Sequence, residues 1–115
     1  MNNSNNLILD LTLNFALKII EYSEVLEENK KYVISRQLLK SGTSIGANVH
    51  EAQNAESKAD FIHKIKIASK EIEETQYWLK LCEFSENYPN PDNLKNELTE
   101  IAKICNRIIF TSKTR

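Results

Sequence analysis

Glycine, proline and cysteine are all scarce in this chain, which contains two of each among its 115 residues. A turn-rich β protein needs more glycine and proline, so the scarcity indicates long helices joined by few loops. No apolar run approaches the roughly 18 residues that a membrane span requires. The net charge is −1, so no overall basic field marks the chain as a nucleic-acid-binding protein.

The chain's length and its sparse cysteines set the expected domain organisation. A chain of this length forms one domain with one core. Cys82 and Cys105 lie far apart in apolar helical patterns without a CxxC partner, which predicts two free core thiols. The run Met1–Asn6 lacks the basic start and the small-residue cleavage site of a signal peptide, so we expect a cytoplasmic location.

Four segments carry apolar residues at helical spacing, and none shows sustained alternation, which predicts an all-α fold. The expected helices span residues 10–28, 31–53, 57–87 and 91–110, and residues 1–9 and 111–115 are expected to fray. Short connections make consecutive helices antiparallel. The prediction is therefore a single-domain, antiparallel up-down-up-down four-helix bundle over residues 1–115.

Each expected helix has an apolar seam that faces a common core. In the first helix Leu13, Leu17 and Ile20 lie on one face, which is widened by Phe15, Ile19, Tyr22 and Leu26. The seams of the other three helices step by four and three residues: Leu38, Gly42, Ile45, Val49 and Ala52; Phe61, Ile65, Ala68, Ile72, Thr75, Leu79 and Cys82; Leu94, Leu98, Ile101, Cys105 and Ile108. Ser57 is expected to cap the third helix and Asn90 the fourth.

Two glycines, Gly42 and Gly46, fall inside the second helix, where each costs about 1 kcal/mol relative to alanine. Ser41, Ser44 and Ala47 beside them are also small. This cluster favours close approach of a neighbouring backbone. A break in the helix near Gly42 is the alternative.

The third helix carries a second apolar stripe outside its seam, consisting of Ile67, Tyr77, Trp78, Leu81 and Phe84. A helix that is apolar on two faces is central to a larger core or contacts another subunit. A bundle of this size has no larger core, so the stripe predicts a homo-oligomer interface. The alternative is that these residues only broaden the face turned to the bundle's own core.

No arrangement of residues indicates catalysis, so the chain is expected to be neither an enzyme nor a cofactor or metal protein. His50 and His63 lie on different helices and lack further ligands at metal-site spacing. Glu71, Glu73 and Glu74 lack the ExxH pairs of di-iron bundles and are interpreted as a solvated acidic face.

Asn48 and Glu51 are polar residues three apart on one face of the second helix, close to its apolar seam. Polar groups near a core need hydrogen-bond partners. We expect both side chains to bond to the third helix or to the loop at Gln53 and Asn54. Their predicted role is structural, because such bonds would fix the corner between the two helices.

In the antiparallel arrangement the charges separate towards opposite ends. We define the basic end as the end where the second helix stops, the third begins and the fourth finishes. It receives Lys58, Lys64, Lys66, Lys70, Lys103, Arg107, Lys113 and Arg115, with Asp10, Glu51, Glu56, Asp60 and Glu100 opposing them. The acidic end receives Glu21, Glu24, Glu27, Glu28, Glu71, Glu73, Glu74, Glu83 and Glu86, offset in part by Lys30, Lys31, Arg36, Lys40 and Lys80.

The basic end supplies the only ligand hypothesis that the residues offer. A cluster of cations binds phosphate through counterion release, which predicts RNA or DNA binding by Lys58, Lys64, Lys66, Lys70, Lys103 and Arg107. The alternative is that the two poles serve only solubility and assembly, because no aromatic side chain is interleaved among the cations for base stacking. A second function hypothesis is a protein-binding assembly or adaptor module without a nucleic-acid ligand.

The stretch Gln37–Ala52, with the core pattern SIxANxxE at Ser44–Glu51, resembles the four-helix bundle proteins encoded in intervening sequences of 23S rRNA genes. The resemblance continues from Ser57 to Leu79 and covers residues 13–109. It implies a homopentameric ring and a similarity to the accessory variability proteins of diversity-generating retroelements, which bind nucleic acid and a reverse transcriptase. The chain departs from the pattern at Ala52, where the family often has glycine, and in its slightly acidic net charge.

Overall fold

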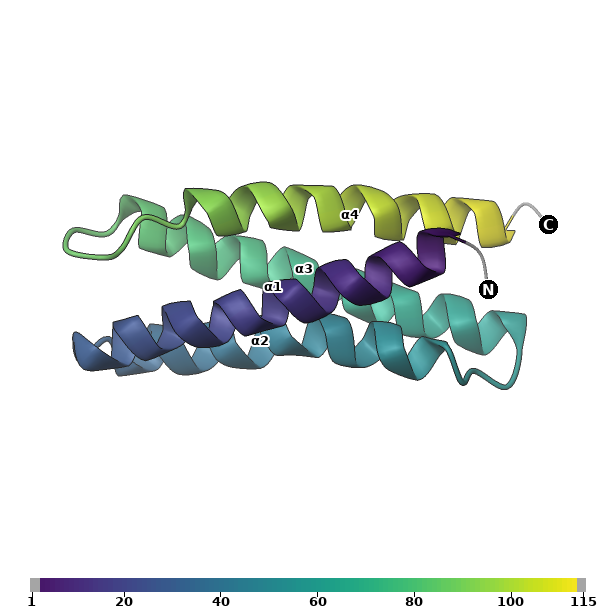
Figure 1. The fold of residues 1–115 in the computed structure, drawn as a ribbon, viewed down its shortest axis with the longest axis horizontal. Coiled ribbons are helices and arrows are strands. Elements are labelled where there is room, and N and C mark those ends of the chain that lie inside the picture. The colour runs from purple at the N-terminus through teal and green to yellow at the C-terminus, as the bar shows by residue number, and fades with distance from the viewer. Residues whose placement is uncertain (1–2, 114–115) are drawn as a thin grey trace.

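Four helices make up the part of the chain that the computed structural model describes, which is residues 3–113, with side chains from residue 7 onward. They are α1 (Asn3–Glu28), α2 (Tyr32–Ala52), α3 (Lys58–Phe84) and α4 (Asp92–Lys113), and the described residues contain no strand. The predicted all-α, four-helix class is confirmed. Figure 1 shows the chain turning back at each connection, so that the α2–α3 loop lies at the same end as the start of α1 and the end of α4.

Each helix packs against two neighbours, in the cyclic order α1, α2, α3, α4 and back to α1. The bundle measures 48 × 20 × 19 Å. Ion pairs join three of the four neighbouring pairs: Lys18 with Glu97, Lys64 with Glu51 and Lys95 with Glu83. The long, narrow shape separates the two tips of the bundle, but Lys70 of the predicted basic end and Glu71 of the predicted acidic end are adjacent near the middle of α3.

The predicted cap of α3 is confirmed, and Asn90 bonds the first N–H group of α4, which begins at Asp92 and not at Pro91 as expected. The Ser57 hydroxyl accepts a hydrogen bond from the backbone N–H of Asp60 at 3.0 Å, and the Asp60 carboxylate accepts one from the N–H of Glu56 at 3.2 Å. These bonds satisfy N–H groups that the first turn of a helix leaves free. The Asn90 side-chain oxygen accepts a bond from the N–H of Asp92 at 2.8 Å.

The first helix begins earlier than the sequence pattern predicts. Residues 3–9 and 111–113, which were expected to fray, are helical, while residues 1–2 and 114–115 lie outside the described residues. The cause at the N-terminal side is Ile8, whose side chain is fully buried in the core. Burying it outweighs the weak helix propensity of the asparagine-rich start.

The predicted core face of α1 is wrong. Leu13, Leu17 and Ile20 are exposed, whereas the residues expected only to widen that face form the core contact: Phe15, Ile19, Tyr22 and Leu26. Both sets repeat at helical spacing, so the periodicity alone could not choose between them. The bulkier aromatic set fills the interior, and the leucines are left on the surface.

The seams of α2, α3 and α4 are buried as predicted, except that Phe61 is only half-buried. Their one polar member, Thr75, donates a hydrogen bond to the Glu71 carbonyl at 2.7 Å and lies 2.9 Å from the Ser41 hydroxyl of α2. The buried hydroxyls are therefore satisfied. This contact fixes the register of α2 against α3.

The small residues of α2 admit close approach of α1, as predicted, and α2 continues through Gly42 without a break. A Cβ atom at Gly42 would lie 2.9 Å from Cγ2 of Ile19, and one at Gly46 would lie 3.4 Å from the backbone oxygen of Thr12. Glycine is required at the first position because a methyl group there would overlap Ile19.

At the acidic end, Tyr22 links α1 to the loop between α3 and α4. Its hydroxyl donates a hydrogen bond of 2.6 Å to the carbonyl of Pro89 in the α3–α4 loop. Burial, followed by the neighbouring Cys82 thiol, raises the pKa of Tyr22 far above its usual value, so the phenol stays protonated and keeps donating.

Candidate nucleic-acid interface

The six cations predicted to bind nucleic acid come from the first half of α3 and the second half of α4. They do not form one equivalent set. Lys64 is turned towards α2 and pairs with Glu51 at 3.3 Å, and Lys58, the first residue of α3, already interacts with another group. Lys66, Lys70, Lys103 and Arg107 are exposed and form no ion pair with a described acidic residue.

Lys66 of α3 lies beside Lys113 of α4. Lys113 lowers the pKa of Lys66, first through a hydrogen bond between the two side chains and then through repulsion between their charges. A hydrogen bond between two amines needs one of them to accept, which favours the neutral form. A phosphate bound between the two side chains would offset the repulsion between their charges.

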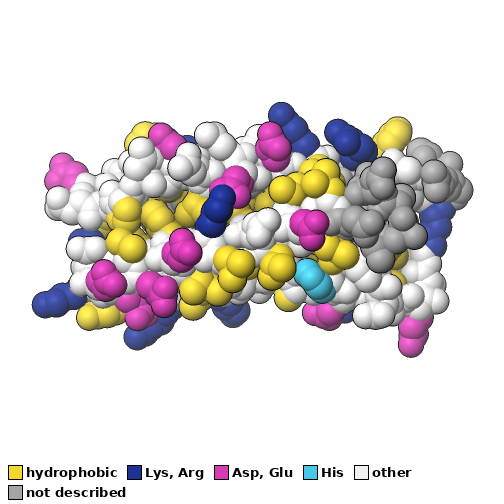
Figure 2. All heavy atoms as spheres, viewed as in Figure 1, with side chains coloured by type: hydrophobic (Ala, Val, Ile, Leu, Met, Phe, Trp, Pro, Cys, Tyr) yellow, Lys and Arg dark blue, Asp and Glu magenta, His cyan; other side chains and the backbone are white. Residues whose placement is uncertain are grey.

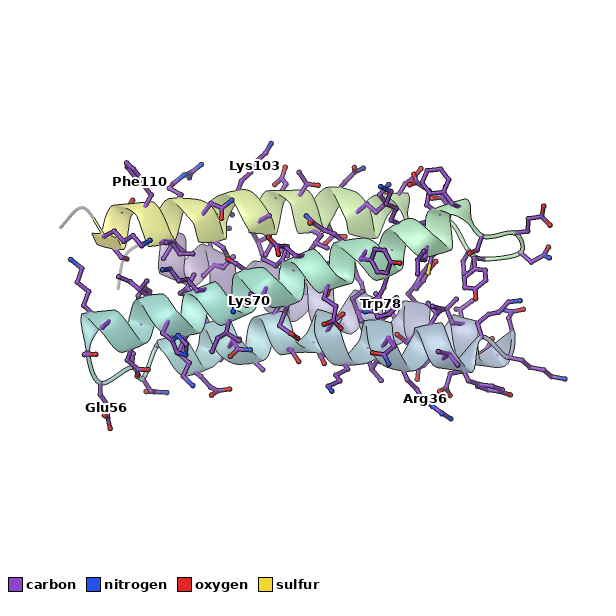
Figure 3. All side chains as sticks on the ribbon, turned by 180° about the vertical axis from the view of Figure 1, so that it is seen from behind. Arg36, Glu56, Lys70, Trp78, Lys103 and Phe110 are labelled. Atoms are coloured by element: carbon purple, nitrogen blue, oxygen red, sulfur yellow. The ribbon has the colours of Figure 1, made fainter. Side chains whose placement is uncertain are left out.

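The surface of α4 adds Lys103, Arg107 and Phe110 to this region. Figure 3 shows Lys103 and Phe110 pointing the same way, outward from α4. Phe110 lies three residues from Arg107 and three from Lys113, a spacing at which side chains are neighbours on a helix. Its side chain is 70% exposed. The prediction that no aromatic residue is interleaved among the cations is therefore wrong.

A polar hollow of about 200 Å³ borders this region between α3 and α4, and Ser69 and Asn106 are among its lining residues. The buried hydroxyl oxygen of Ser69 has no hydrogen-bond partner among the described residues. Buried hydroxyl groups are rarely left unsatisfied. The Ser69 hydroxyl is therefore an unsatisfied buried group beside the hollow, which Glu73 and the exposed Asn106 also line.

The opposite end of the bundle carries excess acidic charge. Figure 2 shows acidic side chains crowded over the last turns of α1. Glu27 and Glu28 occupy the last turn of α1, where the described helix has no basic residue. Carboxylates at this position face the negative end of the helix dipole, which is unfavourable. Glu27 and Glu28 thus lie at the predicted acidic end, whereas Glu71, Glu73 and Glu74, which were also expected there, lie near the middle of α3 beside Lys70.

Two apolar stripes lie on the surface. The first, which we call the α1–α2 stripe, consists of Leu13, Leu17, Ile20 and Leu39. Figure 2 shows hydrophobic side chains along this face. Leu39 lies one turn before Gly42, and Gly42 packs closely against Ile19 of α1. Leu39 is therefore on the side of α2 that faces α1. Nothing in the described chain covers these side chains.

The second, which we call the α3 stripe, is the set predicted as an oligomer interface: Ile67, Tyr77, Trp78, Leu81 and Phe84. Tyr77 and Phe84 are exposed, the latter to 75%, while Ile67, Trp78 and Leu81 are half-buried. Trp78 packs against the core, and its indole N–H donates to Glu74 at 3.1 Å. Figure 3 shows Trp78 on α3, close to α2. Three residues of the stripe are therefore partly buried in the bundle, while Phe84 and Tyr77 are exposed, the Tyr77 ring packing edge-on against Trp78 at 5.5 Å between ring centroids.

The chain matches the 23S rRNA-intervening sequence proteins over residues 4–108. The chain belongs to this family. The search of solved structures found a crystal structure at 1.70 Å resolution of a protein of unknown function from the S23 ribosomal protein family of Bacteroides thetaiotaomicron VPI-5482. It is 44% identical to this chain, with a TM-score of 0.86, and the match covers 92% of this chain and 97% of that one. The search of curated proteins found no match.

The motif that suggested this family, the 23S rRNA-intervening sequence proteins, contains the two residues predicted to bond across the helix corner. Glu51 does so through Lys64 of α3. Asn48 does not, because its amide donates to the Ser44 carbonyl within α2 at 2.9 Å. The Asn48 side chain therefore forms its hydrogen bond within its own helix, a pattern common for short polar side chains.

The cysteines and His50 have local surroundings within the bundle of this family member. Cys82 and Cys105 are free and buried, as predicted, and burial raises the pKa of Cys105 to about 11. His50 bonds to the Gly46 carbonyl. Among residues 3–113, no group of three or more His, Cys, Asp or Glu side chains could hold a metal ion, and no helix has the apolar length for a membrane crossing.

Proposed function

We propose that this protein is a non-catalytic, antiparallel up-down-up-down bundle that assembles into a ring and binds RNA or DNA through its basic end. The observation that carries the proposal is the group of exposed cations that no described acid neutralises: Lys66, Lys70, Lys103, Arg107 and Lys113. A homopentamer is the assembly that the family resemblance implies. A ligand of the ribosomal RNA type would place this activity in the cytoplasm.

The binding energy in this proposal comes from phosphate contacts. Each cation that neutralises a phosphate releases a condensed counterion, so affinity falls steeply as salt is added. A ring would bring several basic ends together, and a polymer that spans them would bind more tightly than to one chain. A related role beside a reverse transcriptase, as in the accessory variability proteins, would use the same surface.

Neutralising the cations tests nucleic-acid binding. Glutamine at Lys66, Lys103, Arg107 and Lys113 is expected to weaken binding to an RNA hairpin and a DNA duplex. Because each lost phosphate contact removes about 0.7–0.9 from the slope of log affinity against log salt, the slope should shrink by roughly 3. Fluorescence anisotropy from 20 to 200 mM salt, roughly the range over which such contacts are screened, measures both quantities.

A matched control removes the same charge from the acidic end. The control variant carries glutamine at Lys30, Arg36, Lys40 and Lys80. It should bind as the unmodified protein does, because these side chains lie away from the basic end. Absence of binding at low salt, or an equal loss in the two variants, would contradict a nucleic-acid role for this end.

The assembly in this proposal joins two different surfaces. A cyclic ring of more than two subunits needs a head-to-tail contact between unlike patches. The α1–α2 stripe and the exposed rings of the α3 stripe, Tyr77 and Phe84, are two such apolar patches on different helices. We therefore place the α1–α2 stripe of one subunit against the α3 stripe of the next.

Leu17→Glu tests this contact. Leu17 is 52% exposed, so the glutamate is solvated in a single chain but desolvated in the assembly. Light scattering should show a multiple of 13.3 kDa for the unmodified protein and about 13.3 kDa for the variant. Val33→Glu, at a residue that is 72% exposed outside both stripes, should leave the mass unchanged. An unmodified protein that is monomeric would refute the ring.

A second candidate function is a protein-binding adaptor. The observation that favours it is the pair of exposed aromatic rings, Tyr77 and Phe84, because exposed aromatic residues are enriched at protein interfaces. The anisotropy titration separates the two functions. An assembled protein that binds no nucleic acid at low salt would leave the adaptor as the function.

A further inference from the structure

Phe110 has a setting unlike that of the other exposed apolar residues. A single exposed phenylalanine is ordinary on a protein surface. This one lies one turn from Arg107 on one side and one turn from Lys113 on the other, and two turns from Lys103. No described acid pairs with these cations. The ring is therefore the apolar centre of a positively charged surface.

Lys66 extends this surface from α4 onto α3, where it meets Lys113. The hollow lined by Ser69 and Asn106 lies next to it, because Ser69 follows Lys66 by one turn and Asn106 precedes Phe110 by one turn. One small region thus contains cations, an accessible aromatic face and an exposed side-chain amide.

We propose that Phe110 is a stacking platform for an unpaired base of single-stranded nucleic acid, whose phosphates are held by Lys66, Lys103, Arg107 and Lys113. This inference rests on the nucleic-acid binding proposed above and specifies its ligand. Proteins that bind single strands combine a basic surface with aromatic rings on which bases stack. The exposed Asn106 amide, one turn before Phe110, can donate or accept hydrogen bonds at the edge of the stacked base.

A single strand is the form that fits this chemistry. In a duplex the bases are stacked on one another, so a surface ring reaches one only after the duplex opens, which costs a few kcal/mol. In an unpaired strand the faces of the bases are free. The cations alone would bind either form through phosphate, so Phe110 is the residue that distinguishes the two.

Binding of short probes to Phe110 variants tests the inference. The probes are a ten-nucleotide oligouridine, the matching oligothymidine and a DNA duplex of equal length, each followed by fluorescence anisotropy at low salt. Phe110→Ala should weaken binding of the single strands roughly 5- to 150-fold, since a stacked base contributes about 1–3 kcal/mol. Duplex binding and the salt slope should not change, because the cations remain.

Three further variants sharpen the result. Phe110→Leu keeps an apolar side chain without a ring and should lose affinity as Phe110→Ala does. Phe110→Trp should retain affinity, and its fluorescence should be quenched when a base stacks on it. Tyr32→Ala removes an exposed ring at the acidic end and should leave binding unchanged. If Phe110→Ala loses more affinity for oligouridine than for oligothymidine, RNA is identified as the ligand. If it loses more affinity for oligothymidine, DNA is identified.

The outcomes separate this inference from the proposal on which it rests. If the glutamine variant loses binding but Phe110→Ala binds single strands normally, the platform is refuted and the nucleic-acid function stands. The platform is also refuted if Phe110→Ala weakens duplex and single strand equally. If the unmodified protein binds none of the probes, the nucleic-acid function itself fails. Circular dichroism confirms that each variant is folded.

Discussion

Phe15→Ala is expected to lower the free energy of unfolding by about 3–5 kcal/mol, the usual cost of deleting a buried aromatic side chain. Phe15 is fully buried where α1 meets the core. Its removal loses the transfer free energy of the ring and leaves a cavity that the surrounding helices cannot fill. Because domains of this size are stable by about 5–15 kcal/mol, the variant should be near the limit of folding.

Leu17→Ala is the matched comparison. Leu17 follows Phe15 by two residues but is half exposed in the single chain, so its truncation should cost less than about 1 kcal/mol at a protein concentration low enough for the chain to be monomeric. Urea unfolding followed by circular dichroism, at one fixed protein concentration, measures both variants. Equal losses would show that α1 does not present Phe15 to the core in solution. A larger loss of unfolding free energy for Leu17→Ala would indicate that the predicted face of Leu13, Leu17 and Ile20 is the buried one.

Gly42→Val is expected to destabilise the bundle by about 3 kcal/mol, at the upper end of the range for overpacking a core. The new Cβ would lie 2.9 Å from Cγ2 and 3.0 Å from Cγ1 of Ile19. Both atoms are attached to the branched Cβ of a fully buried isoleucine, so rotation of its side chain cannot clear the contact. The helices α1 and α2 must then move apart, which loosens the core around them.

Gly46→Ala is the control for a glycine in the same helix. A Cβ atom at this position would lie 3.4 Å from its nearest neighbours, which are atoms of Thr12, and this is ordinary packing distance. The substitution should be neutral or stabilise by up to about 1 kcal/mol, because alanine loses less conformational freedom than glycine in a helix. Chemical denaturation distinguishes the two positions, and similar losses at both would contradict the specific role of Gly42.

The sequence predicted the four-helix class, the seams of α2 to α4 and two N-caps. These features have local signals: spacings of three and four residues, a serine three residues before an aspartate, and a proline next to an asparagine. The core face of α1 could not be chosen, because both of its apolar sets have helical period. Which set is buried depends on how the aromatic rings fit between α2 and α4, and that is a tertiary property.

The candidate site was predicted in outline only. Folding the chain back at short loops was enough to gather lysines and arginines at one end. The sequence could not show that Lys64 is neutralised by Glu51, because that depends on side-chain geometry between two helices. Phe110 was missed although a signal existed, since its spacing of three from Arg107 and from Lys113 already placed it among cations.

The helices α1 and α4 differ in whether the charges in their last turns suit the helix dipole. Lys113 lies in the last turn of α4, where the helix dipole favours a cation, and the last turn of α1 holds Glu27 and Glu28 against its dipole. Each chain is thus a rod 48 Å long with its own electric polarity. In the field of a phosphate polymer such a rod would experience a torque that turns its basic end towards the polymer. The glutamate-rich tip would then project away from the polymer, so that one molecule could meet a second, cationic partner at a distance of its own length.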